Sequence, residues 1–75
     1  MESIKIECSK GWVKVERLID EQKESVKLTT NIDDEGELGL TLSYDAIEKA
    51  DKSFNNLSKQ NPDELQVAIL QMLGL

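Results

Sequence analysis

The sequence contains no histidine and only one cysteine, Cys8. The absence of histidine excludes Ser-His-Asp triads, histidine-based acid–base catalysis and the commonest side-chain ligand of transition metals. A single cysteine cannot form a disulfide within the chain, which fits a reducing compartment. Cys8 falls inside an alternating segment and is expected to face inward as a small apolar residue. We therefore predict a protein that is not an enzyme and that carries no cofactor and no metal ion.

Basic residues are also scarce: 9 lysines and arginines stand against 15 aspartates and glutamates, and the net charge is −6. Binding to nucleic acid through its phosphates requires a basic face, so direct nucleic-acid binding is not expected. The same charge disfavours anionic membranes but permits a basic protein partner. Acidic side chains gather at residues 16–24 and 33–37, which leaves an acidic mimic of nucleic acid as one alternative function.

Long apolar runs and signal-like segments are missing as well. No apolar stretch approaches the about 20 residues of a membrane-spanning helix, so no membrane role is expected. The start of the chain shows no apolar signal-peptide core, and we expect a cytoplasmic protein. The 75 residues are expected to form a single domain. A domain of this size buries only about 60% of its unfolded surface, so self-association would add stability.

Apolar and polar residues alternate in four segments, at residues 3–9, 12–19, 26–33 and 37–43. Alternation with a period of two is the pattern of a strand with one buried face. Short connections between such strands predict an antiparallel meander, with the apolar residues of all four strands on one face.

The first connection predicts the register of a hairpin. A two-residue turn at 10–11 would pair Cys8 with Val13 and would keep opposite charges together on the outer face. The same phase places Arg17 on the inner face. Either a bulge redirects this side chain, or it lies at the rim of the sheet with its stem packed and its charged group in water.

The third connection is acidic. A three-residue loop at 34–36, with its glycine in the left-handed conformation, would pair Ile32 with Leu38. Residues 31–38 also resemble the first part of an EF-hand calcium loop. However, Leu42 stands where that loop requires a bidentate glutamate, and strands replace the flanking helices. We therefore interpret the segment as a hairpin turn.

Two helices are expected after the strands, at residues 44–59 and 62–73. Ser43 or Asp45 is expected to cap the first helix. Asn61, followed by a proline at the first helical position, is expected to cap the second. Because the strands precede the helices, the predicted class is α+β: a four-stranded antiparallel β-meander followed by two α-helices packed on one face of the sheet.

The last helix is apolar on two sides. The side expected to pack on the sheet consists of Leu65, Ala68, Ile69, Met72 and Leu73. Val67 and Leu70 point roughly to the opposite side. These two residues either pack on a neighbouring helix of the same chain or contact another subunit or partner.

Trp12 is expected on the outer face of the sheet, together with Leu18. It is either an anchor for a partner or a side chain that covers its own strand beside the turn. The predicted partner-binding residues are therefore Trp12, Leu18, Val67 and Leu70.

These observations favour a small acidic, non-enzymatic protein–protein interaction domain. Its role would be that of an inhibitor or adaptor, such as those encoded by phages or mobile elements. The second hypothesis is a homodimeric structural or assembly protein joined through the C-terminal helix. The expected partner is another protein, a second copy of the chain, or both.

Overall fold

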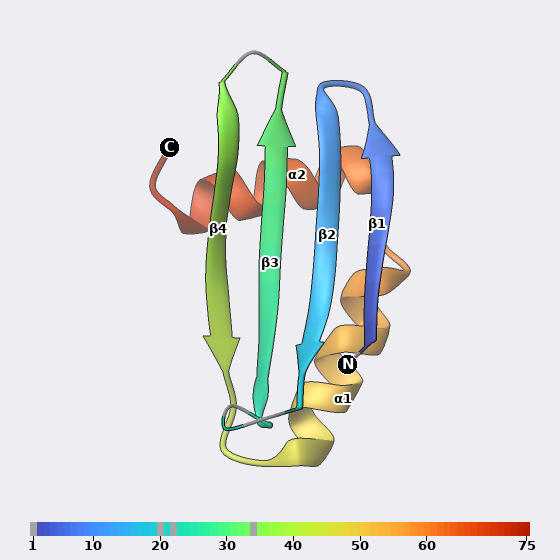
Figure 1. Ribbon diagram of the computed structural model, residues 1–75, viewed down its shortest axis with the longest axis vertical. Coiled ribbons are helices and arrows are strands. Elements are labelled where there is room, and N and C mark those ends of the chain that lie inside the picture. The colour runs from blue at the N-terminus through green and yellow to red at the C-terminus, as the bar shows by residue number, and fades with distance from the viewer. Residues whose placement is uncertain (1, 20, 22, 34) are drawn as a thin grey trace.

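The computed structural model describes residues 2–19, 21, 23–33 and 35–75. Its strands form one antiparallel sheet in the order β1-β2-β3-β4, and two helices lie on one face of this sheet (Figure 1). This arrangement confirms the predicted α+β class, with a four-stranded meander followed by two helices. In the described residues, no helix has both the length and the apolar character needed to cross a membrane.

Neighbours in the sheet are neighbours in the sequence, so every connection is short. The strands are β1 (Glu2–Cys8), β2 (Gly11–Leu18), β3 (Ser25–Ile32) and β4 (Gly36–Ser43). The helices are α1 (Ile47–Ser58) and α2 (Pro62–Met72).

The core lies between the inner face of the sheet and the two helices. The alternation in β2 and β3 directs every second side chain inward, and the helices supply the opposing residues. The buried apolar residues are Val13, Val15, Val26, Leu28, Ala50, Phe54, Leu65 and Ile69. Burial of each large apolar side chain contributes about 1.5–3 kcal/mol, so this cluster is the main source of stability in so small a protein.

The predicted register of the first hairpin is wrong. Cys8 lies opposite Gly11 rather than Val13. Gly11 opens β2 with a φ of +135°, and a Cβ at this position would come within 1.8 Å of the Asn31 carbonyl oxygen. The close approach of β3 therefore requires the glycine here, and the turn lies one residue earlier. Displacement by two residues keeps each side chain on its predicted face, so the core is unaffected.

The second predicted register is displaced in the same way. Ile32 lies opposite Gly36 rather than Leu38. Gly36 has the positive φ that was predicted, +91°, but it opens β4. The Glu35 N–H donates to the Ile32 carbonyl at 2.9 Å and closes the turn. Asp34, the first residue of the predicted loop, lies outside the described residues.

The start of α1 differs from the prediction. The helix begins at Ile47, and its N-cap is Ala46, which has no side chain able to accept a hydrogen bond. The predicted caps are wrong because Ser43 is still part of β4 and Asp45 forms an ion pair instead. The Asp45 carboxylate lies 2.7 Å from the Lys49 ammonium, one turn further along.

Arg17 faces inward, as the unbroken alternation requires, and is only 4% exposed. Both predicted alternatives for this side chain, a bulge and a position at the rim of the sheet, are wrong. β2 continues without a bulge, and the guanidinium is not in water. Its Nε–H donates to Asp51 Oδ1 at 2.8 Å. Its terminal nitrogens donate to the carbonyls of Leu18 (2.6 Å), Ser25 (3.2 Å) and Ile47 (3.4 Å). These bonds offset the loss of hydration and join the end of β2 to α1.

The start of α2 confirms the predicted cap. The Asn61 side-chain oxygen accepts from the N–H groups of Asp63 (2.9 Å) and Glu64 (3.2 Å), and Pro62 is the first helical residue. The Asp63 carboxylate in turn accepts from the Ser9 N–H at 2.7 Å and the Ser9 hydroxyl at 2.8 Å. The hydrogen bond from the backbone, followed by that from the hydroxyl, lowers the pKa of Asp63. The turn between β1 and β2 is thereby fastened to α2.

The lowered pKa gives the contact a pH dependence. A carboxylate with a depressed pKa stabilises the folded state above its ordinary pKa of 3.8, and this contribution is lost as the pH falls through the lowered value. Asp63→Asn should therefore destabilise the protein at neutral pH, and its difference from the wild type should shrink in acid. Urea unfolding over this pH range measures the difference.

The control is Glu64→Gln, which removes a charge from the same helical turn and leaves Ser9 untouched. Its loss of stability at neutral pH should be smaller than that of Asp63→Asn. Equal losses in the two variants would show that the Ser9 contact contributes nothing beyond the helix-dipole effect.

Removal of the carboxylate that holds Arg17 should also destabilise the fold. Asp51→Ala leaves a buried guanidinium without its only charged acceptor among the described residues, and we expect a loss of about 1–3 kcal/mol. Asp45→Ala breaks the exposed pair with Lys49 and should cost no more than about 0.5 kcal/mol. Chemical unfolding of both variants decides the matter, and equal costs would contradict the role given to Arg17.

Candidate functional site

The C-terminal part of α2 extends past the edge of the sheet. In Figure 1, α2 crosses behind the strands from the β1 side and ends beyond β4. Its packing contacts are mainly with β1, β2 and β3. The first turns of α2 therefore lie on the sheet, whereas its last residues project beyond it.

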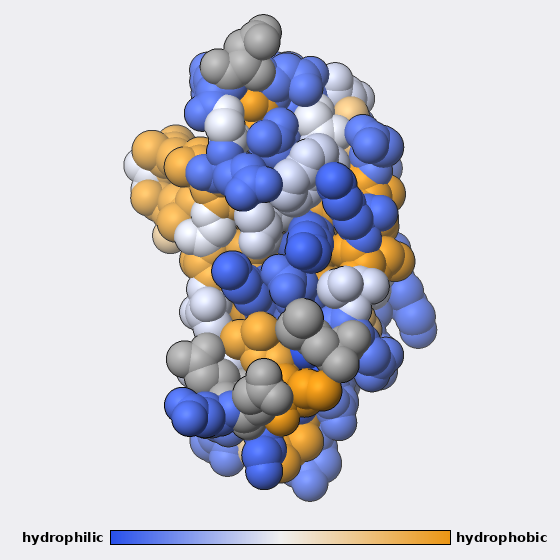
Figure 2. Space-filling view, in the orientation of Figure 1, coloured by the Kyte–Doolittle hydropathy of each residue, from blue (hydrophilic) through white to orange (hydrophobic). Residues whose placement is uncertain are grey.

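Apolar side chains remain exposed along the second half of α2. Leu65 and Ile69 face the core and are fully buried. Val67 points away from these two residues and is 54% exposed, and Met72, the last helical residue, is 49% exposed. Figure 2 shows apolar atoms gathered on the same side of the molecule, at the left, where α2 ends in Figure 1. The expected burial of Met72 is wrong, because the helical spacing turns it toward the sheet layer at a point where no strand lies beneath it.

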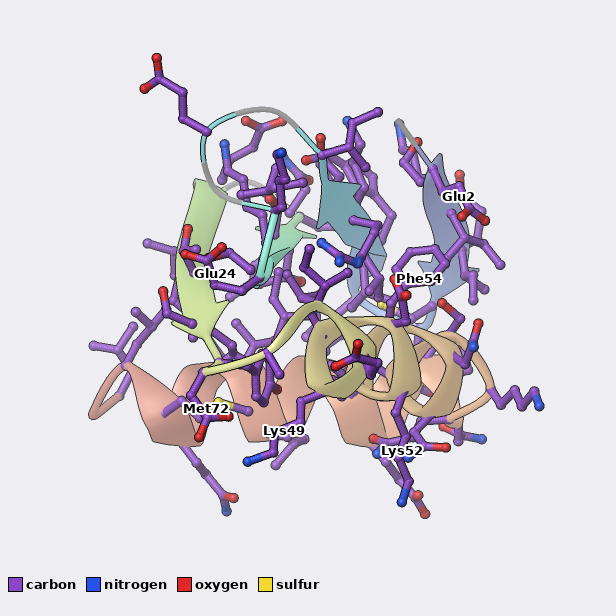
Figure 3. The ribbon with its side chains drawn as sticks, turned by 90° about the horizontal axis from the view of Figure 1, so that it is seen from below. Glu2, Glu24, Lys49, Lys52, Phe54 and Met72 are labelled. Carbon is purple, nitrogen blue, oxygen red and sulfur yellow. The ribbon has the colours of Figure 1, made fainter. Side chains whose placement is uncertain are left out.

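We call the four residues Val67, Leu70, Met72 and Leu73 the α2 overhang. Leu70 and Leu73 are half-buried, and Leu73 still packs against the core. Figure 3 shows Met72 on the β4 side of the molecule, well separated from Phe54, which points from α1 toward the sheet. Since Val67 stays exposed, it does not pack on a neighbouring helix of the chain.

A buried amide fixes the position of α2. Gln66 is only 6% exposed, and its Nε2–H donates to the Thr30 hydroxyl oxygen at 3.0 Å. That hydroxyl donates to the Trp12 carbonyl at 2.9 Å, so one polar chain joins α2, β3 and β2. Sequence reasoning missed this residue. The available signal is its spacing, because Gln66, Ile69 and Leu73 follow one another at intervals of three and four and share a helix face.

The edge strand β4 lies beside the overhang. In the described part of the chain it pairs with β3 alone, so its other edge presents free backbone N–H and C=O groups. Its inward residues, Leu38, Leu40 and Leu42, are only half-buried. These leucines are incompletely covered because α1 packs mainly on β2 and β3, and α2 mainly on β1, β2 and β3.

The outer face of the sheet carries the other two predicted contact residues. Trp12 and Leu18 both point to this face and are half-buried. They lie near opposite ends of β2, roughly 20 Å apart at the rise of an extended strand, so they do not form one patch. The Trp12 ring is already covered in part by the Lys5 ammonium, 4.4 Å from its centroid. Such a contact contributes about 0.5–1 kcal/mol at an exposed site.

The four predicted residues are therefore divided between two surfaces. Val67 and Leu70 lie together in the overhang, on the helix side of the sheet, whereas Trp12 and Leu18 lie separately on the outer face. Several apolar side chains are neighbours in the overhang, whereas on the outer face of the sheet Trp12 and Leu18 are separated. The geometry thus favours the C-terminal half of α2 as the candidate contact surface.

The acidic hairpin loop and Cys8 are the remaining places where side-chain chemistry could occur. Across residues 2–19, 21, 23–33 and 35–75, no three histidine, cysteine or acidic side chains lie close enough together to hold a metal ion. Asp34 of the calcium-like segment is outside these ranges. Cys8 faces inward, as expected, and packs half-buried against the core.

No protein-family model, curated protein or solved structure matches this chain. The overhang and the edge of β4 are therefore identified from geometry and surface chemistry. Both belong to one side of the molecule, where the helix layer is wider than the sheet.

Proposed function

We propose that the protein is a non-enzymatic protein–protein interaction domain that acts in the cytoplasm as an inhibitor or adaptor. The observation that carries this proposal is the α2 overhang. Exposed apolar side chains that adjoin on one helix are typical of a binding surface, whereas single exposed apolar residues are ordinary. Val67 and Met72 are exposed, Leu70 is half-buried, and Leu73 packs against the core.

The composition of the overhang supports a protein partner. The four side chains of the overhang are apolar, although the chain as a whole has a net charge of −6. An apolar surface within an acidic protein suits a partner with an apolar groove and a basic rim, because the apolar contact supplies affinity and the opposite charge speeds association. This combination disfavours nucleic acid as a direct ligand.

A capture experiment tests the proposal. The tagged protein is incubated with lysate of its source cells, and bound proteins are identified by mass spectrometry. Val67→Lys should weaken capture at least tenfold, because it places a charge on the apolar contact surface one turn before Leu70. The variant should remain folded, with stability within about 0.5 kcal/mol of the wild type, since Val67 is exposed.

Two further variants locate the contact. Asn55→Lys makes the same change in charge at an exposed position of α1, away from the α2 overhang, and should leave capture intact. Trp12→Ala examines the outer face of the sheet and should also leave capture intact. Loss of capture with Trp12→Ala but not with Val67→Lys would contradict the proposal and move the contact to the sheet.

A further inference from the structure

The free edge of β4 lacks the features that usually protect a sheet edge. Proline, lysine, bulges and inward-pointing charges prevent strands of other molecules from pairing with an edge. β4 (Gly36–Ser43) has eight residues without a proline or lysine, and Glu37 is its only charged residue. The opposite edge strand, β1, carries Glu2, Lys5 and Glu7. The two edges therefore differ in how readily they accept another strand.

The sequence of β4 is complementary to itself in the antiparallel direction. A two-fold axis through Leu40 places Leu40 opposite its own copy and Leu38 opposite Leu42, so every leucine meets a leucine. It also places Glu37 opposite Ser43 and so separates the two glutamates. A two-fold axis through Gly39 leaves Leu42 without a leucine partner, and an axis between residues would pair inward with outward side chains.

The α2 overhang supplies the cover that an added strand needs. A strand joined to β4 would continue the sheet into the space next to the projecting end of α2 (Figures 1 and 3). Its inward leucines would then pack against the overhang. Around a two-fold axis, the overhang of each copy would lie over the β4 of the other, so both half-buried surfaces would be covered at once.

We propose that β4 pairs in antiparallel fashion with β4 of a second copy of this chain, with the two-fold axis at Leu40 and with the α2 overhangs covering the seam. This inference rests on the proposed function in one respect, because it takes the α2 overhang as the contact surface. The occupant, however, is a second copy of the acidic chain in place of a protein with a basic rim. Backbone pairing provides hydrogen-bond partners for the free N–H and C=O groups of β4. Burial of the leucines and overhangs adds an apolar contribution to the free energy of dimerisation. Both effects help a chain that is short for a stable monomer.

The net charge of −6 on each copy opposes the dimer through repulsion. Salt screens this repulsion and leaves the apolar seam unchanged, so dimerisation should strengthen as the ionic strength is raised. A dimer held by ion pairs would weaken instead, which contradicts the proposed seam.

Sedimentation velocity at about 100 µM, which detects a dimer with a Kd in the micromolar range, is the first test. The wild type should sediment as a dimer. Leu40→Lys should give monomers, because the two new charges would face each other across the axis. Ser3→Lys, at an exposed position on the other edge strand, should remain dimeric.

Circular dichroism shows whether Leu40→Lys is folded. If it is not, Thr41→Lys decides, since this residue is exposed on the outer face of the same strand and a lysine there protects the edge. A wild-type monomer, a dimer unaffected by the β4 variants, or dissociation by Ser3→Lys would each overturn the inference. Capture of another protein that depends on Val67 would still support the proposed function if the wild type were a monomer.

A cysteine cross-link tests the register. In a Cys8→Ser background, Leu40→Cys should form a disulfide between copies under mild oxidation, because only a residue on the axis meets itself. Leu38→Cys should not cross-link alone but should do so when mixed with Leu42→Cys. Equal cross-linking of all three single-cysteine variants would contradict pairing at this axis.

Discussion

Two helices have to cover one apolar face of the sheet, and the position of α2 on that face determines which residues stay exposed. α2 is fixed at its start by Asp63 and Ser9 and in its middle by Gln66 and Thr30. These contacts hold the first half of the helix over the inner strands. The end of the helix therefore projects past β4 and leaves Met72 exposed, whereas Val67 is exposed because it points away from the sheet.

Polar groups buried in the core reinforce this arrangement. Arg17 joins the end of β2 to α1 through Asp51 and the Ile47 carbonyl, and Gln66 joins α2 to β3. A buried polar group that loses its partner is costly, so each of these bonds penalises displacement of its helix. The overhang is thus a consequence of packing that is fixed elsewhere, and the space beside β4 is part of the same geometry.

The fold class could be predicted from the sequence because alternation assigns each strand residue to a face. The register could not, since a displacement of two residues preserves those faces. The pairing of opposite charges favoured the wrong register, because Lys5 in fact lies opposite Lys14. The close approach of Asn31 to Gly11 fits the observed pairing. Helical spacing predicted that Val67 points away from the sheet, but it left open whether a neighbouring helix of the chain covers this residue. The exposure of Met72 could not be predicted, because helical spacing gives the direction of a side chain but not the width of the sheet beneath it.

The β4 edge and the end of α2 together form the proposed contact surface. Backbone amide exchange of the unmodified protein, followed by NMR at increasing protein concentration, tests it most directly. The account predicts that exchange slows in β4, around Leu40, while the amides of the β1 edge are unchanged. Exchange in β4 that is independent of concentration and equal to that of β1 would contradict the account.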